Sequence, residues 1–251
     1  MSPASVLVPL YQYPVTPETW GPLYAAIDQH PNVQFLIIVN PNSGPGDTLT
    51  PDANYAHEIP RLNSRANVQT LGYVSTDYCR RNVADVVRDV GVYAGWSRLA
   101  VEGVYVQGIF FDETPNLWSV GAADYLNLIT TEVKKDTGIQ GNRLVMHNPG
   151  TIPDPNLAHE KPDITAIFEA SYASYQSEWT QAQLDAGHYD RASSSFIVHS
   201  TSIEEIANLV NELRTRAEYL FVTDLQDRYY ESFGQGWTTF IEAVAADLAV
   251  E

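Results

Sequence analysis

The chain has 251 residues, of which 44% are hydrophobic and 11% aromatic, so its composition is that of a globular protein and excludes extensive disorder. Lys and Arg total 14 against 31 Asp and Glu, and the resulting net charge of −17 argues against nucleic acid and anionic membranes as partners. A single cysteine excludes a disulfide framework, and no run approaches the ~18 apolar residues that a membrane span needs.

Short runs of β-branched and aromatic residues recur along the chain, each bounded by turn residues. Eight such runs are predicted as strands: 6–13, 33–41, 68–76, 104–113, 143–149, 163–172, 194–200 and 219–225. Because most of these runs are apolar throughout rather than alternating, they are typical of a parallel sheet that is buried on both faces.

Stretches with helical periodicity separate many of the strands. Thr16 and Pro17 predict the start of a first helix, as its N-cap and first residue, ahead of an apolar run that ends at Ile27. Apolar stripes predict further helices over 82–99, 122–136, 202–217 and 240–248.

Strands that alternate with helices indicate parallel β-α units, and eight repeats in this length predict a single (β/α)8 TIM barrel over 1–251. An open doubly wound sheet is the alternative, but the first strand lacks the Gly-x-Gly-x-x-Gly turn of dinucleotide-binding sheets.

Barrel active sites lie at the C-terminal ends of the strands, and here those ends are polar. Asp112 and Glu113 end the fourth strand, and Glu169 follows an apolar run in the sixth. Because adjacent strand residues point to opposite faces, Asp112 and Glu113 cannot both face the barrel axis, so a productive carboxyl pair needs Glu169. Helix capping or a salt bridge is the structural alternative for each acid taken alone.

Other polar and aromatic residues at the strand ends suit sugars, since rings stack on pyranose C–H groups and amides or acids bind hydroxyls. The predicted substrate contacts are Tyr11, Asn40, Asp47, Tyr73, His147, Asn148, Tyr172, Asp224 and Trp237. His147 and His199 lack the spacing of a metal-binding motif, so each is expected to be a structural histidine or to hydrogen-bond a sugar. Gly-x-Ser-x-Gly is absent, and no metal ligand, cofactor or serine nucleophile is predicted.

Six motifs occur in an order that resembles the spherulin-4 family of glycoside hydrolases (glycoside hydrolase family 135). They are VPLYQYP at 8–14, NPNSGPG at 40–46, GYV at 72–74, GIFFDE at 108–113, NPG at 148–150 and FE at 168–169. The resemblance implies a (β/α)8 enzyme that cleaves α-1,4-linked N-acetylgalactosamine in galactosaminogalactan, a fungal exopolysaccharide. It also implies that acids ending the fourth and sixth strands, matching Asp112, Glu113 and Glu169, carry the reaction.

We therefore expect an endo-acting hydrolase in which Asp112 is the nucleophile or electrostatic stabiliser, Glu169 the general acid/base and Glu113 an orienting residue. The sequence alone leaves the roles of Asp112 and Glu113 exchangeable. A carbohydrate-binding barrel without turnover and a metal-dependent hydrolase are the alternatives.

The expected partner is an oligosaccharide or polysaccharide, with the chain acting as a monomer. Partly deacetylated galactosaminogalactan is cationic, so the acidity could attract substrate as well as maintain solubility. Typical family members are secreted or membrane-anchored, so a secreted or cell-wall location is expected, with the leader absent from this chain; a cytoplasmic location is the alternative.

Overall fold

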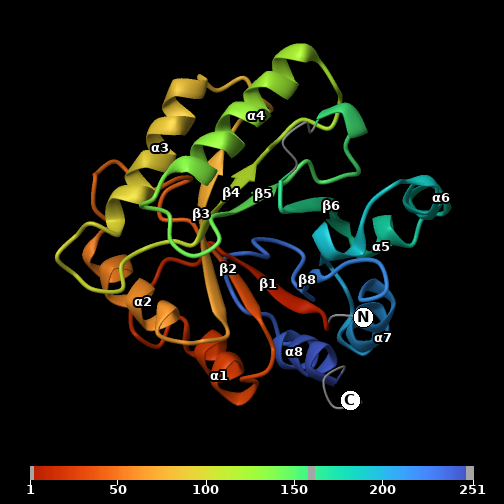
Figure 1. Cartoon of the computed structure of the whole chain (residues 1–251). Helices are drawn as coiled ribbons and strands as arrows, with labels where there is room; N and C mark the ends of the chain where they lie inside the picture. Colours follow the sequence, from red (N-terminus) through yellow and green to blue (C-terminus); the bar gives the residue numbers. More distant parts are fainter. Residues whose placement is uncertain (1–2, 158–161, 247–251) are drawn as a thin grey trace.

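The computed structural model describes residues 3–157 and 162–246, within which eight parallel strands form a closed barrel in sequence order (Figure 1). This arrangement confirms the predicted (β/α)8 fold. The strands are β1 (Ser5–Leu10), β2 (Phe35–Val39), β3 (Val68–Ser75), β4 (Gly108–Asp112), β5 (Leu144–His147), β6 (Ile164–Ser171), β7 (Ser194–His199) and β8 (Tyr219–Val222).

Helices surround the barrel on its outer side (Figure 1). Those described are α1 (Gly21–Gln29), α2 (Ala53–Asn63), α3 (Val83–Trp96), α4 (Val120–Lys135), α5 (Tyr172–Tyr175), α6 (Glu178–Ala186), α7 (Ile203–Leu213) and α8 (Trp237–Ala245), with short 3-10 turns at Pro155–Leu157 and Arg191–Ser193. None of the described helices is long and apolar enough to cross a membrane.

Several boundaries differ from the predictions. α1 begins at Gly21, because Thr16 instead closes a turn in which its carbonyl accepts the backbone N–H of Thr19. The strand predicted over 104–113 begins only at Gly108. Helices α2, α5 and α6 were not predicted. The helix predicted over 240–248 begins earlier, at Trp237, and residues 247–248 lie outside the described residues.

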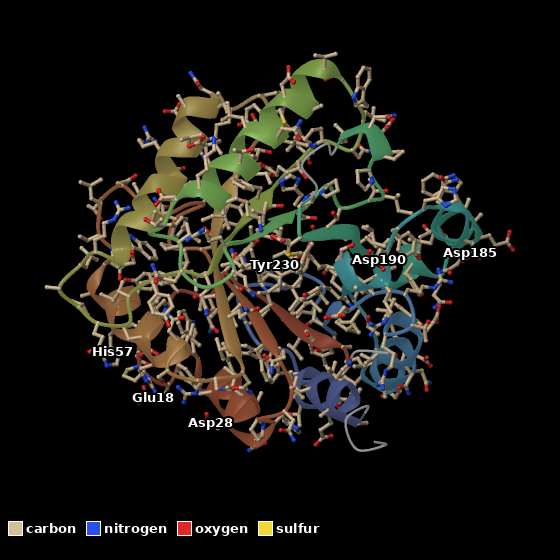
Figure 2. All side chains as sticks on the ribbon, viewed as in Figure 1. Glu18, Asp28, His57, Asp185, Asp190 and Tyr230 are labelled. Atoms are coloured by element: carbon tan, nitrogen blue, oxygen red, sulfur yellow. The ribbon has the colours of Figure 1, made fainter. Side chains whose placement is uncertain are left out.

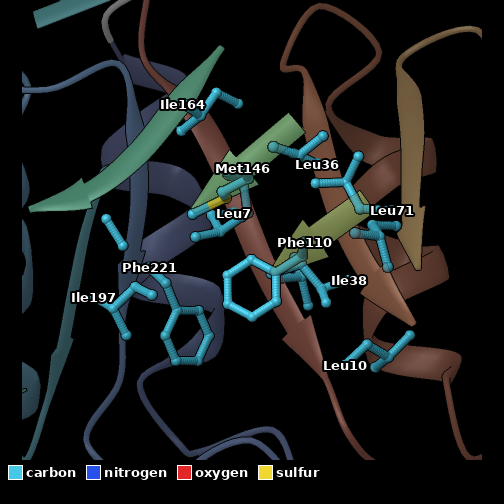
Figure 3. Close-up of a cluster of buried hydrophobic side chains, with 14 of the residues drawn as sticks. Leu7, Leu10, Leu36, Ile38, Leu71, Phe110, Met146, Ile164, Ile197 and Phe221 are labelled. Atoms are coloured by element: carbon cyan, nitrogen blue, oxygen red, sulfur yellow. The ribbon is translucent and has the colours of Figure 1, made fainter. Parts of the chain in front are cut away.

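The barrel interior is filled by apolar side chains from every strand (Figure 3). Those labelled in the close-up include Leu36, Leu71, Phe110, Met146 and Ile197, all buried. Because strand side chains alternate, residues two positions further along each strand face the same interior, one layer nearer the C-terminal rim. This rule determines which rim residues can meet.

β6 departs from regular alternation at a point that matters for the site. Ile164 faces the interior, and unbroken alternation would then turn Phe168 inward and Glu169 outward. The β6–β7 register shifts between Ala166 and Phe168, so Glu169 pairs with the inward-facing Ile197. The bulge therefore directs the Glu169 carboxylate into the barrel, a common use of bulges next to functional sites.

Candidate active site

A ring of polar side chains closes the C-terminal end of the barrel interior. Tyr73, Asp112 and Asn148 lie two residues beyond the interior positions Leu71, Phe110 and Met146. The β6 bulge adds Glu169 to the same layer. The predicted carboxyl pair is thus brought together from β4 and β6.

Asp112 accepts three hydrogen bonds. The Tyr73 hydroxyl donates to Oδ2 over 2.8 Å, while the Glu113 backbone N–H and Asn148 Nδ2 donate to Oδ1, each over 2.8 Å. Three donors fix the carboxylate plane and stabilise a negative charge on it.

Glu169 is held from two sides. Tyr230 donates its hydroxyl to Oε1, and Asn148 Nδ2 lies 2.5 Å from Oε2. Tyr230 belongs to the loop after β8 and lies near the centre of the barrel in Figure 2, whereas Asp28 and Asp185 lie at the periphery. A tyrosine outside any strand therefore completes the support of the second carboxylate.

Asn148 bridges the two acids through one amide nitrogen. Its Oδ1 accepts the Gly150 backbone N–H over 3.0 Å, which orients the amide so that both Nδ2 protons face carboxylates. Nδ2 lies 2.8 Å from Asp112 Oδ1 and 2.5 Å from Glu169 Oε2, so these two oxygens are at most 5.3 Å apart, the sum of both distances. Retaining glycosidases separate their carboxyls by ~5–5.5 Å, whereas inverting enzymes need ~6.5–9.5 Å.

The shared environment alters the acidity of the pair. Burial, followed by the negative charge of Glu169, raises the pKa of Asp112 to about 6 despite the three hydrogen bonds that oppose the shift. Because the carboxyls interact, the proton lost at this pH belongs to the pair rather than to one residue. The pair therefore loses a proton as the pH rises through about 6.

Glu113 turns away from the barrel axis. Its φ of +53° places it in the left-handed region, and Ser75 Oγ donates to its Oε2 over 2.6 Å. The Glu113 carbonyl accepts the Tyr78 backbone N–H over 2.6 Å and the Thr76 hydroxyl over 2.8 Å. This geometry fits the predicted orienting role, since the Glu113 N–H supports Asp112 while its side chain is bound elsewhere.

Tyr11 lies between the tyrosines that hold the two acids. Its ring meets Tyr73 edge-on at 5.4 Å and Tyr230 at 5.0 Å, so it does not offer the free flat face predicted for a sugar platform. Burial and then the charge of Asp112 raise the pKa of Tyr11, and its hydroxyl has no hydrogen-bond partner among the described residues. That hydroxyl is free to contact a ligand.

Two predicted contacts lie outside this ring. His147 alternates with Asn148, so it faces the helices, where Nε2 meets the Thr130 hydroxyl at 3.1 Å. Trp237 begins α8 and is buried, with its indole N–H donating to the Pro22 carbonyl over 3.3 Å. Both residues have packing roles in the structure.

The β2–α2 loop contains two more of the predicted substrate contacts. Asn40 uses Oδ1 to accept the Gly44 backbone N–H over 3.2 Å, which stabilises the loop, and Asp47 is exposed. The last two predicted substrate contacts, Asp224 and Tyr172, lie near helix ends.

Asp224 accepts the Gly236 backbone N–H over 3.0 Å beside the start of α8. Tyr172 begins α5, and burial followed by the charge of Glu205 in α7 raises the pKa of its hydroxyl. Neither residue is hydrogen-bonded to the carboxyl pair.

Sequence reasoning missed Tyr230 and its neighbour Tyr229. Both lie in an irregular segment where no periodicity indicates direction, and adjacent Tyr residues there carry no recognised motif. His199 was expected to be a structural histidine or a sugar hydrogen-bonder, but it was not among the predicted substrate contacts. Among the described residues, no group of three or more His, Cys, Asp or Glu is arranged to hold a metal ion.

Comparison with known proteins identifies the family of this chain. Residues 5–244 match the sequence model of a protein family, spherulation-specific family 4. The chain belongs to that family. Spherulin-4 of Physarum polycephalum is 30% identical to this chain over 217 residues. The match covers 84% of this chain but 60% of Spherulin-4, so the chain spans less than two thirds of the length of that relative.

A solved structure is also similar to this protein. The crystal structure of Aspergillus clavatus Sph3 in complex with GalNAc (N-acetylgalactosamine) matches with a TM-score of 0.92 and 39% sequence identity. The match covers 97% of this chain and 98% of Sph3, so it includes the barrel and its rim together.

Proposed function

We propose that this protein is a retaining, endo-acting glycoside hydrolase that cleaves α-1,4-linked N-acetylgalactosamine in a polysaccharide of the galactosaminogalactan type. The observation that carries the proposal is the Asp112–Asn148–Glu169 bridge, which holds two carboxylate oxygens within 5.3 Å. The similarity to Sph3, whose structure contains GalNAc, supports the choice of sugar.

In the first step, the Asp112 carboxylate attacks the anomeric carbon while Glu169 donates a proton to the glycosidic oxygen, and the C1–O bond breaks. Tyr73, the Glu113 N–H and Asn148 favour negative charge on Asp112. Placing the pair's proton on Glu169 also removes the carboxylate charge that raises the pKa of Asp112. The hydrogen bonds therefore suit a charged nucleophile beside a protonated acid.

In the second step, water attacks the anomeric carbon of the glycosyl–Asp112 ester and gives a proton to Glu169, which now acts as a base. The bond to Asp112 breaks, and the carboxylate returns to its three donors. Two inversions at the same carbon leave the α configuration unchanged.

Endo action is supported by rings beyond the carboxyl pair. Tyr13, Tyr78 and Trp118 follow β1, β3 and β4 and leave about half of their surface exposed at the barrel rim. Exposed aromatic faces in these loops can contact sugar units on either side of the cleaved bond.

The test is the release of reducing ends from purified galactosaminogalactan by the wild type, Asp112→Asn and Glu169→Gln. We expect both variants to fold and to lose at least ~10³-fold in turnover. Asp185→Asn is the matched control, since Asp185 is exposed and pairs only with Arg216 in the described structure. Near-wild-type activity of either site variant would remove that residue from the mechanism, and wild-type binding without cleavage would identify a carbohydrate-binding barrel instead.

A further inference from the structure

His199 lies at the C-terminal end of β7, the strand next to the one that contains Glu169. It ends β7 two residues after Ile197, whose side chain is in the barrel interior, so alternation turns the imidazole inward as well (Figure 3). β7 pairs with β6, where Ile197 is in register with Glu169 and His199 with Ser171. The imidazole therefore occupies the rim layer that contains the carboxyl pair.

The plane of the ring is fixed. Tyr229 stacks on His199 with a centroid distance of 4.2 Å and an interplanar angle of 3°. Tyr229 in turn meets Tyr230 edge-on at 4.5 Å, and Tyr230 donates to Glu169. His199 and the second carboxylate are thus held by one continuous group of rings.

One ring nitrogen is occupied and the other is open. Nδ1 lies 2.9 Å from Ser200 Oγ, the partner of that hydroxyl among the described residues. A hydroxyl proton needs an acceptor, so Ser200 donating to Nδ1 leaves the proton of a neutral imidazole on Nε2. Nε2 has no partner in the described part of the chain. Burial lowers the pKa of His199, although the charge of Glu169 opposes this, which favours the neutral form.

Several other donors near the carboxyl pair are already engaged. The hydroxyls of Tyr73 and Tyr230 and both Nδ2 protons of Asn148 already donate to Asp112 or Glu169. The Tyr11 hydroxyl remains available to a sugar on the β1 side, whereas a contact on the β7 side needs another donor.

We propose that His199 is a substrate-binding residue whose Nε2–H donates to an oxygen of the bound sugar, with Ser200 setting the tautomer and Tyr229 the ring plane. This rests on the proposed function in that it assumes an amino sugar bound at the carboxyl pair. It adds a contact on the β7 side, opposite the β3 and β4 residues that hold Asp112.

The test is nitrogen NMR of the histidine rings in the intact protein, titrated with GalNAc. We expect His199 to show a proton on Nε2 and none on Nδ1, and its Nε2 resonance to shift on saturation together with the Asn148 side-chain amide. A shift of Asn148 without a shift of His199 would overturn this proposal alone. If neither resonance shifted, the site would not bind GalNAc, and the proposed function would fail as well.

Two variants separate the hydrogen bond from the stack. His199→Phe keeps a ring against Tyr229 but removes Nε2–H, so the Kd for GalNAc should rise between about threefold and tenfold with little change in Tm. His199→Gln can place an amide donor near Nε2 and should stay closer to the wild type. His57→Phe is the matched control, because His57 is exposed on α2 (Figure 2). Equal affinity of His199→Phe and the wild type would contradict the proposal.

Discussion

Asn148→Ala should move the pH dependence of catalysis. In the wild type, kcat/KM should fall as the pH rises through about 6, because the carboxyl pair then loses the proton that cleavage delivers to the leaving group. Asn148 favours the ionised pair by donating to both acids over 2.8 and 2.5 Å. Removing the Asn148 amide should raise the pKa of Asp112, and the falling limb of the kcat/KM profile should then shift to higher pH.

The size of this shift follows from the hydrogen bond lost at Asp112. A hydrogen bond to a charged group contributes about 1.5–3 kcal/mol, and one pKa unit corresponds to about 1.4 kcal/mol. The limb should therefore move up by roughly one to two pH units, less where water replaces the amide.

The assay is kcat/KM on a defined α-1,4-linked GalNAc oligosaccharide from pH 4 to 9. His147→Gln is the neighbouring control, because His147 faces Thr130 on the other side of β5 and should leave the limb in place. An Asn148→Ala profile that falls at the wild-type pH would refute the view that Asn148 couples the two acids.

Four further outcomes are expected. With azide and a substrate that has a good leaving group, Glu169→Gln should regain turnover and form the α-glycosyl azide, whereas the β-azide from this variant would exchange the roles of Asp112 and Glu169. Burial lowers the pKa of His147 to about 4, so its contribution to the free energy of unfolding should be fully present above pH ~6.5. That free energy should decrease by about 3 kcal/mol as the pH falls to 4, and acid unfolding curves of His147→Gln should lack this decrease. Tyr230→Phe should lower kcat by about tenfold without loss of Tm, and an unchanged kcat would show that Glu169 needs no support on Oε1. If the acidic surface attracts partly deacetylated polymer, its Kd should rise with salt, and a Kd indifferent to salt would leave solubility as the explanation of the charge.

The fold and the two acids were accessible from sequence because they depend on local rules. Continuous apolar runs ending in Asp112 and Glu169 identify strands and their rim, and closing the barrel brings the ends together. The same alternation excludes His147 from the ring once Asn148 is placed in it, a conclusion that follows from adjacency alone.

The rest of the site depends on features that periodicity does not encode. The β6 bulge that turns Glu169 inward is not evident in the residues around it. Tyr230 reaches the carboxylate from an irregular loop, a contact that exists only after the chain has closed the barrel. Trp237 shows the reverse case, because it was predicted to contact substrate but instead packs between α8 and α1.

The anomeric form of the first product tests the central claim most directly. We predict that proton NMR during cleavage of an α-1,4-linked GalNAc oligosaccharide shows the α-anomer first, with the β-anomer appearing only as the sugar equilibrates in solution. Initial formation of the β-anomer would contradict a retaining reaction at Asp112 and Glu169, and the absence of any new reducing end would contradict hydrolysis itself.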